Sequence, residues 1–286
     1  MVNHLNILVT GSDGQLGRMI KSLSKGYSKY NFFFTNKKTL DITQITKIED
    51  YLIDNKINFI VNCAAFTDVV KSENHKKRAN LVNNLAVGYL SQLCNKYDIK
   101  FIHISTDYVF DGLNYLPYKE NEKPNPVNYY GLSKLNGENR IFENNLKNSI
   151  IIRTSWLYSH FGNNFVSKIM KNIEAYKKVI INANQTGSPT NAKDLAEVLL
   201  KIIPKIKNKK TEIYHFSSFD FCSRFEFASE ICRIFNYSNI ENKICEGKQI
   251  ERPIFSALDT KKISDKFGLK IINWKKSLQE HFDTTI

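Results

Sequence analysis

The chain has 286 residues, enough for one large α/β domain or for a nucleotide-binding domain with a smaller companion. Hydrophobic residues make up 42% of it, which is typical of a globular protein and excludes an intrinsically disordered chain. The formal net charge is +13, but the basic residues stand in short dispersed groups such as Lys37-Lys38 and Lys76-Lys77-Arg78, without interleaved aromatic residues. We interpret them as a solvated surface that attracts anionic ligands in general, and we expect no nucleic-acid partner.

The N-terminal residues lack the basic start and the long apolar stretch of a signal peptide, and no run approaches the roughly 20 apolar residues that span a bilayer. We therefore expect a cytoplasmic protein without membrane contact. The cysteines are scattered and contain no C-x-x-C pair, which argues against a disulfide framework and against a zinc site. We expect reduced, buried thiols and no bound metal; the cysteines are Cys63, which we assign to the core, Cys94, Cys222, Cys232 and Cys245.

The first half of the chain alternates strand-like and helix-like segments, the pattern of a parallel sheet wrapped by helices. The strand candidates are rich in Ile, Val and Phe and continuously apolar, as in strands that helices cover on both faces. They are residues 6–10, 31–35, 59–62, 100–105 and 149–154. The clearest helix spans residues 81–97, and we assign its apolar stripe to the core.

Directly after the first strand, residues 11–17 read GSDGQLG and lead into a helix. In such a loop the first glycine allows a tight turn, the second lets a pyrophosphate approach the backbone, and the third lets helix and strand pack closely. Glycines in a strand–helix turn can also serve geometry alone. The position between the first strand and the first helix of a βαβ unit favours dinucleotide binding.

The end of the second strand bears on the choice of cofactor. An acidic residue there binds the ribose 2′-hydroxyl of NAD, whereas a cation accommodates the 2′-phosphate of NADP. Residues 35–38 read TNKK and contain no carboxylate, so the sequence favours NADPH over NADH. The alternative is that Lys37 and Lys38 both face water.

Three residues form a candidate catalytic set. Thr106 follows the fourth strand, at the edge of the sheet where such folds bind ligands. Tyr130 and Lys134 stand four apart at the start of a predicted helix and so share one face. A free tyrosine has a pKa near ~10, and we expect a neighbouring ammonium and a nicotinamide to lower it by about 3 units. The alternatives are a surface Y-x-x-x-K pair and a threonine that only caps its strand.

The second half is less regular, with predicted helices at residues 164–175, 192–203, 224–235 and 275–282 and short strands near 179–181 and 213–216. The polar, basic segment 205–210 is the best boundary candidate. We predict a Rossmann-type, doubly wound α/β fold with a smaller C-terminal substrate-binding domain. The NAD(P)-binding domain takes residues 1–155 with a returning segment at about 176–204, and the substrate domain takes 205–286 with about 156–175.

These residues resemble the extended short-chain dehydrogenase/reductases, and most closely the dTDP-4-dehydrorhamnose reductase family. The resemblance spans nearly the whole chain. Its motifs are the glycine loop, LDIT at 40–43, NCAAFT at 62–67, STDYVFDG at 105–112, PYKE at 117–120, PNP at 124–126, YGLSKLNGE at 130–138, IRTSWLY at 152–158, QTGSPT at 185–190 and RP at 252–253.

The resemblance implies an NAD(P)H-dependent oxidoreductase that reduces the 4-keto group of a nucleotide-linked 6-deoxy sugar, dTDP-4-dehydro-L-rhamnose, during synthesis of surface polysaccharide precursors. It implies that Tyr130 donates the proton, that Lys134 holds the nicotinamide ribose and tunes Tyr130, and that Thr106 orients the keto oxygen. The implied cofactor contacts also include Gly11, Ser12, Gly14, Gln15, Leu16, Asp41, Ile42, Ala64, Ala65, Thr67 and Asn83. The implied substrate contacts are Thr106, Asp107, Trp156 and Arg252.

The chain departs from the family pattern at Phe66, where tyrosine is usual, and at Val70 and Asn184, where aspartate is usual. These departures leave the identity of the nucleotide sugar open, and the sequence does not settle whether the chain forms a homodimer. Trp156 as a core residue and Arg252 as a surface ion-pair partner remain alternatives to substrate contacts.

Three other functions stay open. They are a reductase of a different nucleotide-linked keto sugar, an epimerase or dehydratase on the same fold, and a non-catalytic regulatory subunit that resembles that of methionine adenosyltransferase. In the dehydratases the catalytic threonine is typically followed by Asp-Glu, whereas Tyr108 takes the second of these places here.

Overall fold

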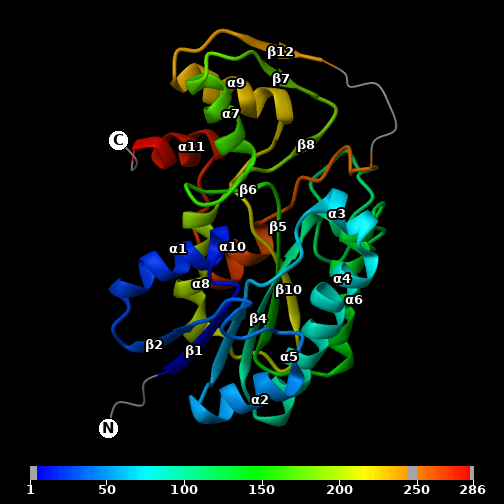
Figure 1. Cartoon of the computed structure of the whole chain (residues 1–286), viewed down its shortest axis with the longest axis vertical. Helices are drawn as coiled ribbons and strands as arrows, with labels where there is room; N and C mark the ends of the chain where they lie inside the picture. Colours follow the sequence, from blue (N-terminus) through cyan, green and yellow to red (C-terminus); the bar gives the residue numbers. More distant parts are fainter. Residues whose placement is uncertain (1–4, 244–249, 284–286) are drawn as a thin grey trace.

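The computed structural model describes residues 5–243 and 250–283 (Figure 1). A six-stranded parallel sheet has the order β2-β1-β3-β4-β5-β10, so the chain winds outward from β1 in both directions. This is the predicted doubly wound Rossmann-type fold, and the prediction is confirmed. The strands are β1 (Leu5–Thr10), β2 (Tyr30–Phe34), β3 (Phe59–Asn62), β4 (Lys100–Thr106), β5 (Ser149–Thr154) and β10 (Glu212–His215).

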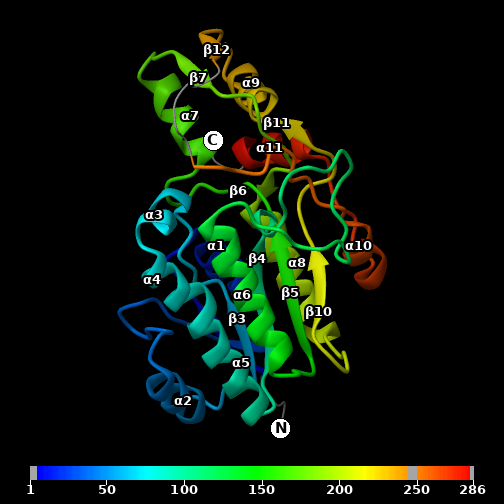
Figure 2. The same cartoon turned by 90° about the vertical axis from the view of Figure 1, so that its right-hand side faces the viewer.

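Helices cover both faces of this sheet, as Figure 2 shows. On one face α1 (Gln15–Leu23), α8 (Ala192–Ile202) and α10 (Lys261–Phe267) pack against a core that includes Ile7 and Val9. On the other face α2 (Ile45–Asp54), α5 (Ala86–Lys96) and α6 (Tyr129–Glu143) pack against a core that includes Leu8. Successive residues of β1 therefore alternate between two apolar layers, which explains why the strand is continuously apolar.

A third core forms the upper part of the molecule in Figure 1. It lies between α7 (Phe165–Glu174), α9 (Arg224–Ile234), α11 (Trp274–Asp283) and the strand pair β7 (Val179–Ile181) and β12 (Ile240–Asn242), with Phe227 at its centre. Two more short pairs are β6 (Leu157–Tyr158) with β9 (Thr190–Asn191), and β8 (Thr186–Gly187) with β11 (Cys222–Ser223). The remaining helical segments are η1 (Ser24–Gly26), α3 (Val69–Asn74), α4 (Lys76–Asn80), η2 (Leu81–Leu85), η3 (Asp107–Val109) and η4 (Ile203–Lys205).

The predicted domain limits need two corrections. The connector at residues 205–210 does not separate the two halves, because β10 follows it and pairs with β5 in the large sheet. Val179 and Ile181 pack in the third core, so the chain returns to the sheet later than residue 176, with α8. Both corrections concern partners distant in sequence, which a local pattern does not specify.

Other predictions changed in detail. The helix predicted at residues 81–97 is interrupted, because η2 is a π-helical turn that precedes α5. Val82 packs against the core, as predicted, and also lines a cavity. Cys63 packs against the core, as predicted, and also lines this cavity. Cys94, Cys222 and Cys232 are buried free thiols, and Cys245 lies outside the described residues. Within the described part of the chain, every helix is too short or too polar to cross a membrane.

Candidate active site

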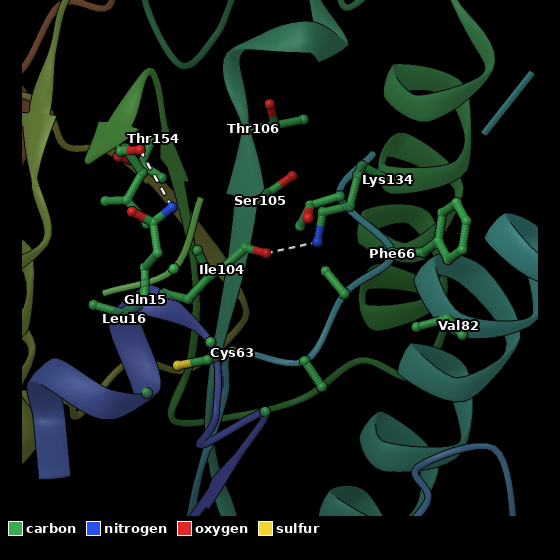
Figure 3. Close-up of a pocket in the computed structure, with 18 of the residues that line it drawn as sticks. Gln15, Leu16, Cys63, Phe66, Val82, Ile104, Ser105, Thr106, Lys134 and Thr154 are labelled. Carbon is green, nitrogen blue, oxygen red and sulfur yellow. Dashed lines mark hydrogen bonds between the residues drawn. The ribbon is translucent and has the colours of Figure 1, made fainter. Parts of the chain in front are cut away.

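A cavity of about 830 Å³ lies where the carboxyl ends of β1, β3, β4 and β5 meet the C-terminal part of the chain. Parallel pairing explains the location, because it brings all four strand ends to the same edge of the sheet. Figure 3 shows Gln15 and Leu16 on one side of β4, Lys134 on its other side, and Ser105 and Thr106 on β4 itself. Segments from both halves of the chain therefore build one site.

The glycine turn has the predicted geometry. Gly11 has a φ of +65°, a left-handed conformation that disfavours any residue with a Cβ, and a Cβ there would stand 2.6 Å from the backbone nitrogen of Ala64. A Cβ on Gly17 would stand 2.5 Å from the carbonyl oxygen of Gly11, so only glycine lets α1 approach the turn. Gly14 is the N-cap of α1, which directs the helix N-terminus into the cavity, where it favours an anion.

Two predicted phosphate-loop residues behave differently from the rest. Ser12 does not line the cavity, because it is buried and its backbone N–H donates to the carbonyl of Thr35 at 2.9 Å. The Gln15 side chain connects the loop to the C-terminal part, since its Oε1 accepts hydrogen bonds from Ser159 at 3.1 Å and Asn164 at 2.9 Å. Gln15 therefore joins the two walls of the cavity.

One end of the cavity is cationic. Lys37 and Arg78 line it together with the predicted contacts Asp41 and Ile42. Hydrogen bonds from Thr43 and the charges of Arg78 and Lys37 keep the pKa of Asp41 below its usual value, although partial burial opposes this. Lys76 and Lys77 are exposed, as predicted for a solvated surface, whereas Arg78 is half-buried and lines the cavity. The sequence alone gave no sign that α4 places its last basic residue beside the end of β2.

The three candidate catalytic residues line the other end of the cavity. Thr106 donates a hydrogen bond to Asp107 at 3.0 Å and has a second hydrogen bond with the side chain of Tyr130. Gly131 makes the contact between Tyr130 and Thr106 possible, because a Cβ at position 131 would stand 2.0 Å from the carbonyl oxygen of Tyr108. The start of α6 can therefore approach η3, and the rings of Tyr108 and Tyr130 pack edge to face with centroids 5.7 Å apart.

The electrostatics of Tyr130 differ from the expectation. Burial raises its pKa above the usual value, the charges of Asp107 and Tyr108 raise it further, and only the hydrogen bond with Thr106 lowers it. The expected lowering by the Lys134 ammonium is therefore wrong for the protein by itself. The Lys134 amine donates instead to the carbonyl oxygen of Ile104 at 2.6 Å, as Figure 3 shows, and lies 3.2 Å from Nε2 of His103. Tyr130 is consequently a neutral phenol over the physiological pH range, able to give a proton.

Asn83 supports the cavity without lining it. Its side chain is fully buried, accepts from the backbone N–H of Phe66 at 2.8 Å and donates to the carbonyl of Phe66 at 2.9 Å and to Ser133 at 3.0 Å. This holds the segment that carries the predicted contacts Ala64, Ala65 and Thr67, all of which line the cavity. Asn83 projects from the π-helical turn η2, a type of distortion that is frequent at functional sites.

Trp156, Phe165 and Arg224, from the C-terminal part of the chain, also line the cavity, and the charge of Arg224 acts on Asp107 next to Thr106. Trp156 has a φ of +43°, which is rare for a residue with a side chain and places its indole against Gly187. The guanidinium of Arg224 lies 3.6 Å from the centre of the Trp156 ring, and burial lowers its pKa to about 10, so that it remains a cation at neutral pH. Sequence reasoning missed Arg224, because no motif marks it.

The two remaining predicted substrate contacts have contrasting environments. Asp107 lines the cavity, and burial raises its pKa to about 6 against the lowering effect of hydrogen bonds from Ser256 and Thr106. Arg252 is exposed and does not line the cavity. Burial raises the pKa of the nearby Tyr108, and the charge of Arg252 opposes this rise. The contact of Arg252 with a substrate stays a prediction.

Comparison with known proteins places this architecture in a family. The family model described as RmlD substrate binding domain matches residues 5–286. The chain is 34% identical to the spore coat polysaccharide biosynthesis protein SpsK of Bacillus subtilis, with 96% of each chain covered. It is 33% identical to a dTDP-4-dehydrorhamnose reductase of Aggregatibacter actinomycetemcomitans, over 96% of this chain and 97% of that one.

Solved structures agree with the sequence comparisons. A dTDP-4-dehydrorhamnose reductase from Bacillus anthracis, in complex with NADP, superposes with a TM-score of 0.92 at 31% identity and covers 98% of this chain and 99% of its own. One from Clostridium acetobutylicum superposes with a TM-score of 0.91 at 33% identity, with the same coverage. A dTDP-glucose 4,6-dehydratase at 18% identity shares the fold, with a TM-score of 0.82. The chain belongs to the dTDP-4-dehydrorhamnose reductase family of oxidoreductases.

Proposed function

We propose that this protein uses NAD(P)H to reduce the 4-keto group of a nucleotide-linked 6-deoxy sugar, and that the sugar is dTDP-4-dehydro-L-rhamnose. The observation that carries the proposal is the arrangement inside one cavity, with the glycine turn and helix N-terminus on one side and the hydroxyls of Thr106 and Tyr130 on the other. The names of the reductase relatives support the substrate class. The name of the SpsK relative supports a place in surface polysaccharide synthesis.

The cavity fits a phosphorylated dinucleotide in two respects. Gly11 and Gly17 let the turn close tightly before α1, since side chains there would collide with the chain itself, and a turn of this kind presents the helix N-terminus to a pyrophosphate. Lys37 and Arg78 suit the 2′-phosphate of NADPH, and guanidinium groups bind phosphates well through paired hydrogen bonds. When bound, the reduced cofactor supplies the hydride.

The protein's own residues then act on the oxygen of the keto group. The Thr106 hydroxyl orients this oxygen, and the neutral phenol of Tyr130 donates its proton as negative charge develops there. Because the pKa of Tyr130 is raised, the phenol does not lose its proton to water before it is needed. General acid catalysis of this kind contributes roughly 10²–10⁴-fold to a rate.

Trp156, Arg224 and Asp107 hold the rest of the substrate. We assign the Trp156 indole to the apolar face of the sugar or base, and the Arg224 cation, stacked on that indole, to the diphosphate. Asp107 lies next to Thr106 and has the geometry to accept a hydrogen bond from a sugar hydroxyl.

The proposal is tested with a panel of nucleotide-linked keto sugars, followed by loss of NADPH and NADH absorbance, with products identified by NMR. Replacing Tyr130 with Phe is expected to abolish most turnover and to leave cofactor affinity intact. Tyr129→Phe is the matched control, because Tyr129 adjoins Tyr130 and does not line the cavity. Near-normal turnover of Tyr130→Phe would refute the assignment, and cofactor binding without turnover of any sugar would indicate a regulatory subunit.

A further inference from the structure

A chain of buried polar side chains connects the core of the sheet to Lys134. Thr10 at the end of β1 donates to Oδ1 of Asn62 at 2.6 Å, Nδ2 of Asn62 lies 3.0 Å from Nδ1 of His103, and Nε2 of His103 lies 3.2 Å from the Lys134 amine. The first three residues are fully buried, and Lys134 is only 2% exposed. The strand register creates this chain, since Thr10 pairs with Asn62 and Asn62 pairs with His103 across β1, β3 and β4.

The hydrogen bonds fix the orientation of the Asn62 amide. The backbone N–H of Ala64 points at Asn62 Oδ1 at 3.3 Å, and a backbone N–H can only donate. The oxygen therefore faces Ala64 and Thr10, and the NH₂ group faces His103. Asn62 must donate to Nδ1 of the ring.

This orientation determines the tautomer of His103. Burial and the neighbouring Lys134 hold the pKa of His103 well below its usual range, so the ring is neutral and carries one proton. Since Nδ1 accepts a hydrogen bond from Asn62, the proton is on Nε2. The Nε2–H group then points at the amine of Lys134.

A donor aimed at Lys134 has opposite effects on the two forms of that side chain. An ammonium carries three N–H donors and no lone pair, so it faces Nε2–H as donor against donor. A neutral amine keeps a lone pair that accepts from Nε2–H, and it still donates to the carbonyl of Ile104 at 2.6 Å. In a buried site a mismatched polar contact is costly, so the pair His103–Asn62 favours the uncharged form of Lys134.

The other groups around Lys134 act less directly. Burial lowers its pKa to about 8, and the charge of Glu138 on the same helix opposes this. Cys63, after β3, is a neutral thiol, because burial raises its pKa to about 12. Glu138 is itself neutralised by Arg153, whose Nη2 lies 2.6 Å from its Oε2. Tyr130, one turn earlier on α6, is a neutral phenol.

We propose that His103 and Asn62 are positioning residues for the reduction, because the tautomer that Asn62 imposes on His103 stabilises the uncharged form of Lys134 and makes its ammonium a proton source. The role in turnover rests on the proposed function, whereas the tautomer and the charge of Lys134 do not. Tyr130 becomes a phenolate when it gives its proton to the alkoxide. An N–H bond of the Lys134 ammonium then breaks, and its proton reaches the phenolate through water in the cavity that both side chains line. The resulting amine accepts from His103, and solvent recharges it.

The experiment begins with cofactor-free protein. Long-range ¹H–¹⁵N NMR of the histidine rings identifies the tautomer, and the ¹³Cε resonance of Lys134 is followed against pH. In the wild type we expect His103 protonated on Nε2. In Asn62→Asp the carboxylate accepts from Nδ1–H, so the ring proton moves to Nδ1, and Nε2 becomes an acceptor for the ammonium. We expect the pKa of Lys134 to rise by about one unit, a tenfold change in its protonation equilibrium.

Two further variants separate this role from simple packing. His103→Leu removes the donor and should also raise the pKa of Lys134, which moves the matching limb of the pH profile of kcat/KM upward. Thr10→Val perturbs the same buried network but leaves the Ala64 N–H to hold Asn62, so the tautomer and the Lys134 titration should stay unchanged.

Clear outcomes overturn the inference. An Nδ1-protonated His103 in the wild type would do so, as would an unchanged Lys134 titration in His103→Leu, even if activity falls. Should Asn62→Asp fail to fold, the wild-type tautomer and His103→Leu still decide the question. If the expected tautomer and titrations are found but no keto sugar is reduced, the proposed function fails and the control of Lys134 stands.

Discussion

Replacing Glu138 with Gln tests how α6 is anchored beside the reacting groups. Glu138 and Arg153 have side chains only 1% and 2% exposed, and they form a two-pronged ion pair from Nε to Oε1 at 3.0 Å and from Nη2 to Oε2 at 2.6 Å. Ser105 also donates to Glu138, at 2.5 Å. The pair therefore ties α6, which carries Tyr130 and Lys134, to β4 and β5.

The substitution keeps the shape of the side chain and removes its charge. It leaves the Arg153 guanidinium buried without a counter-ion, and Nη1 has no hydrogen-bond partner among the described residues that could compensate. Breaking a buried pair in this way costs about 3–5 kcal/mol of unfolding free energy. For a chain of this size the loss corresponds to a melting temperature lower by roughly 10 °C.

Urea and thermal unfolding followed by circular dichroism measure the effect. Glu143→Gln is the control, because it breaks the exposed Arg140–Glu143 pair on the same helix, where we expect less than about 0.5 kcal/mol. In Glu138→Gln/Arg153→Met neither partner is charged, so the double variant should recover much of the loss. A loss below about 1 kcal/mol for Glu138→Gln, or additive losses in the double variant, would refute the reasoning.

Three further predictions concern the walls of the cavity. Gly17→Ala should displace the turn and weaken cofactor binding by at least about tenfold in calorimetry. Gly26→Ala is the control and should leave cofactor binding unchanged, because a Cβ there meets nothing within 4 Å. Equal binding by both variants would contradict the role of the turn. Asp107→Asn should stabilise the fold by about 1–3 kcal/mol above pH 6. Burial raises the pKa of Asp107 from 3.8 to about 6, so a charged Asp107 destabilises the folded state, and the neutral Asn removes this cost. Since that cost is absent below the unfolded pKa, urea unfolding near pH 3 should show no gain, and a gain that persists there would point to another cause. Lys37→Ala and Arg78→Ala should raise the KM for NADPH about tenfold and that for NADH much less, and equal changes for both cofactors would exclude a 2′-phosphate site.

The sequence was informative wherever the function of a residue depends on its neighbours along the chain. The glycine turn, the strand-end Thr106 and the Tyr130–Lys134 spacing are local patterns, and the residues that they pick out line one cavity. The apolar strands likewise predicted the doubly wound sheet, because burial on both faces leaves a continuous signature in each strand.

Only the tertiary structure decided which groups face these residues. The recruitment of Arg78 and Arg224 depends on helices that reach the cavity from opposite halves of the chain. The contact of His103 with Lys134 depends on strand register and on the packing of α6. The raised pKa of Tyr130 has the same origin, since burial and the charges of Asp107 and Tyr108 follow from how the chain closes around the phenol. Periodicity and spacing determine the elements and the residues at their ends, whereas register, burial and long-range contact determine the charge that each group carries.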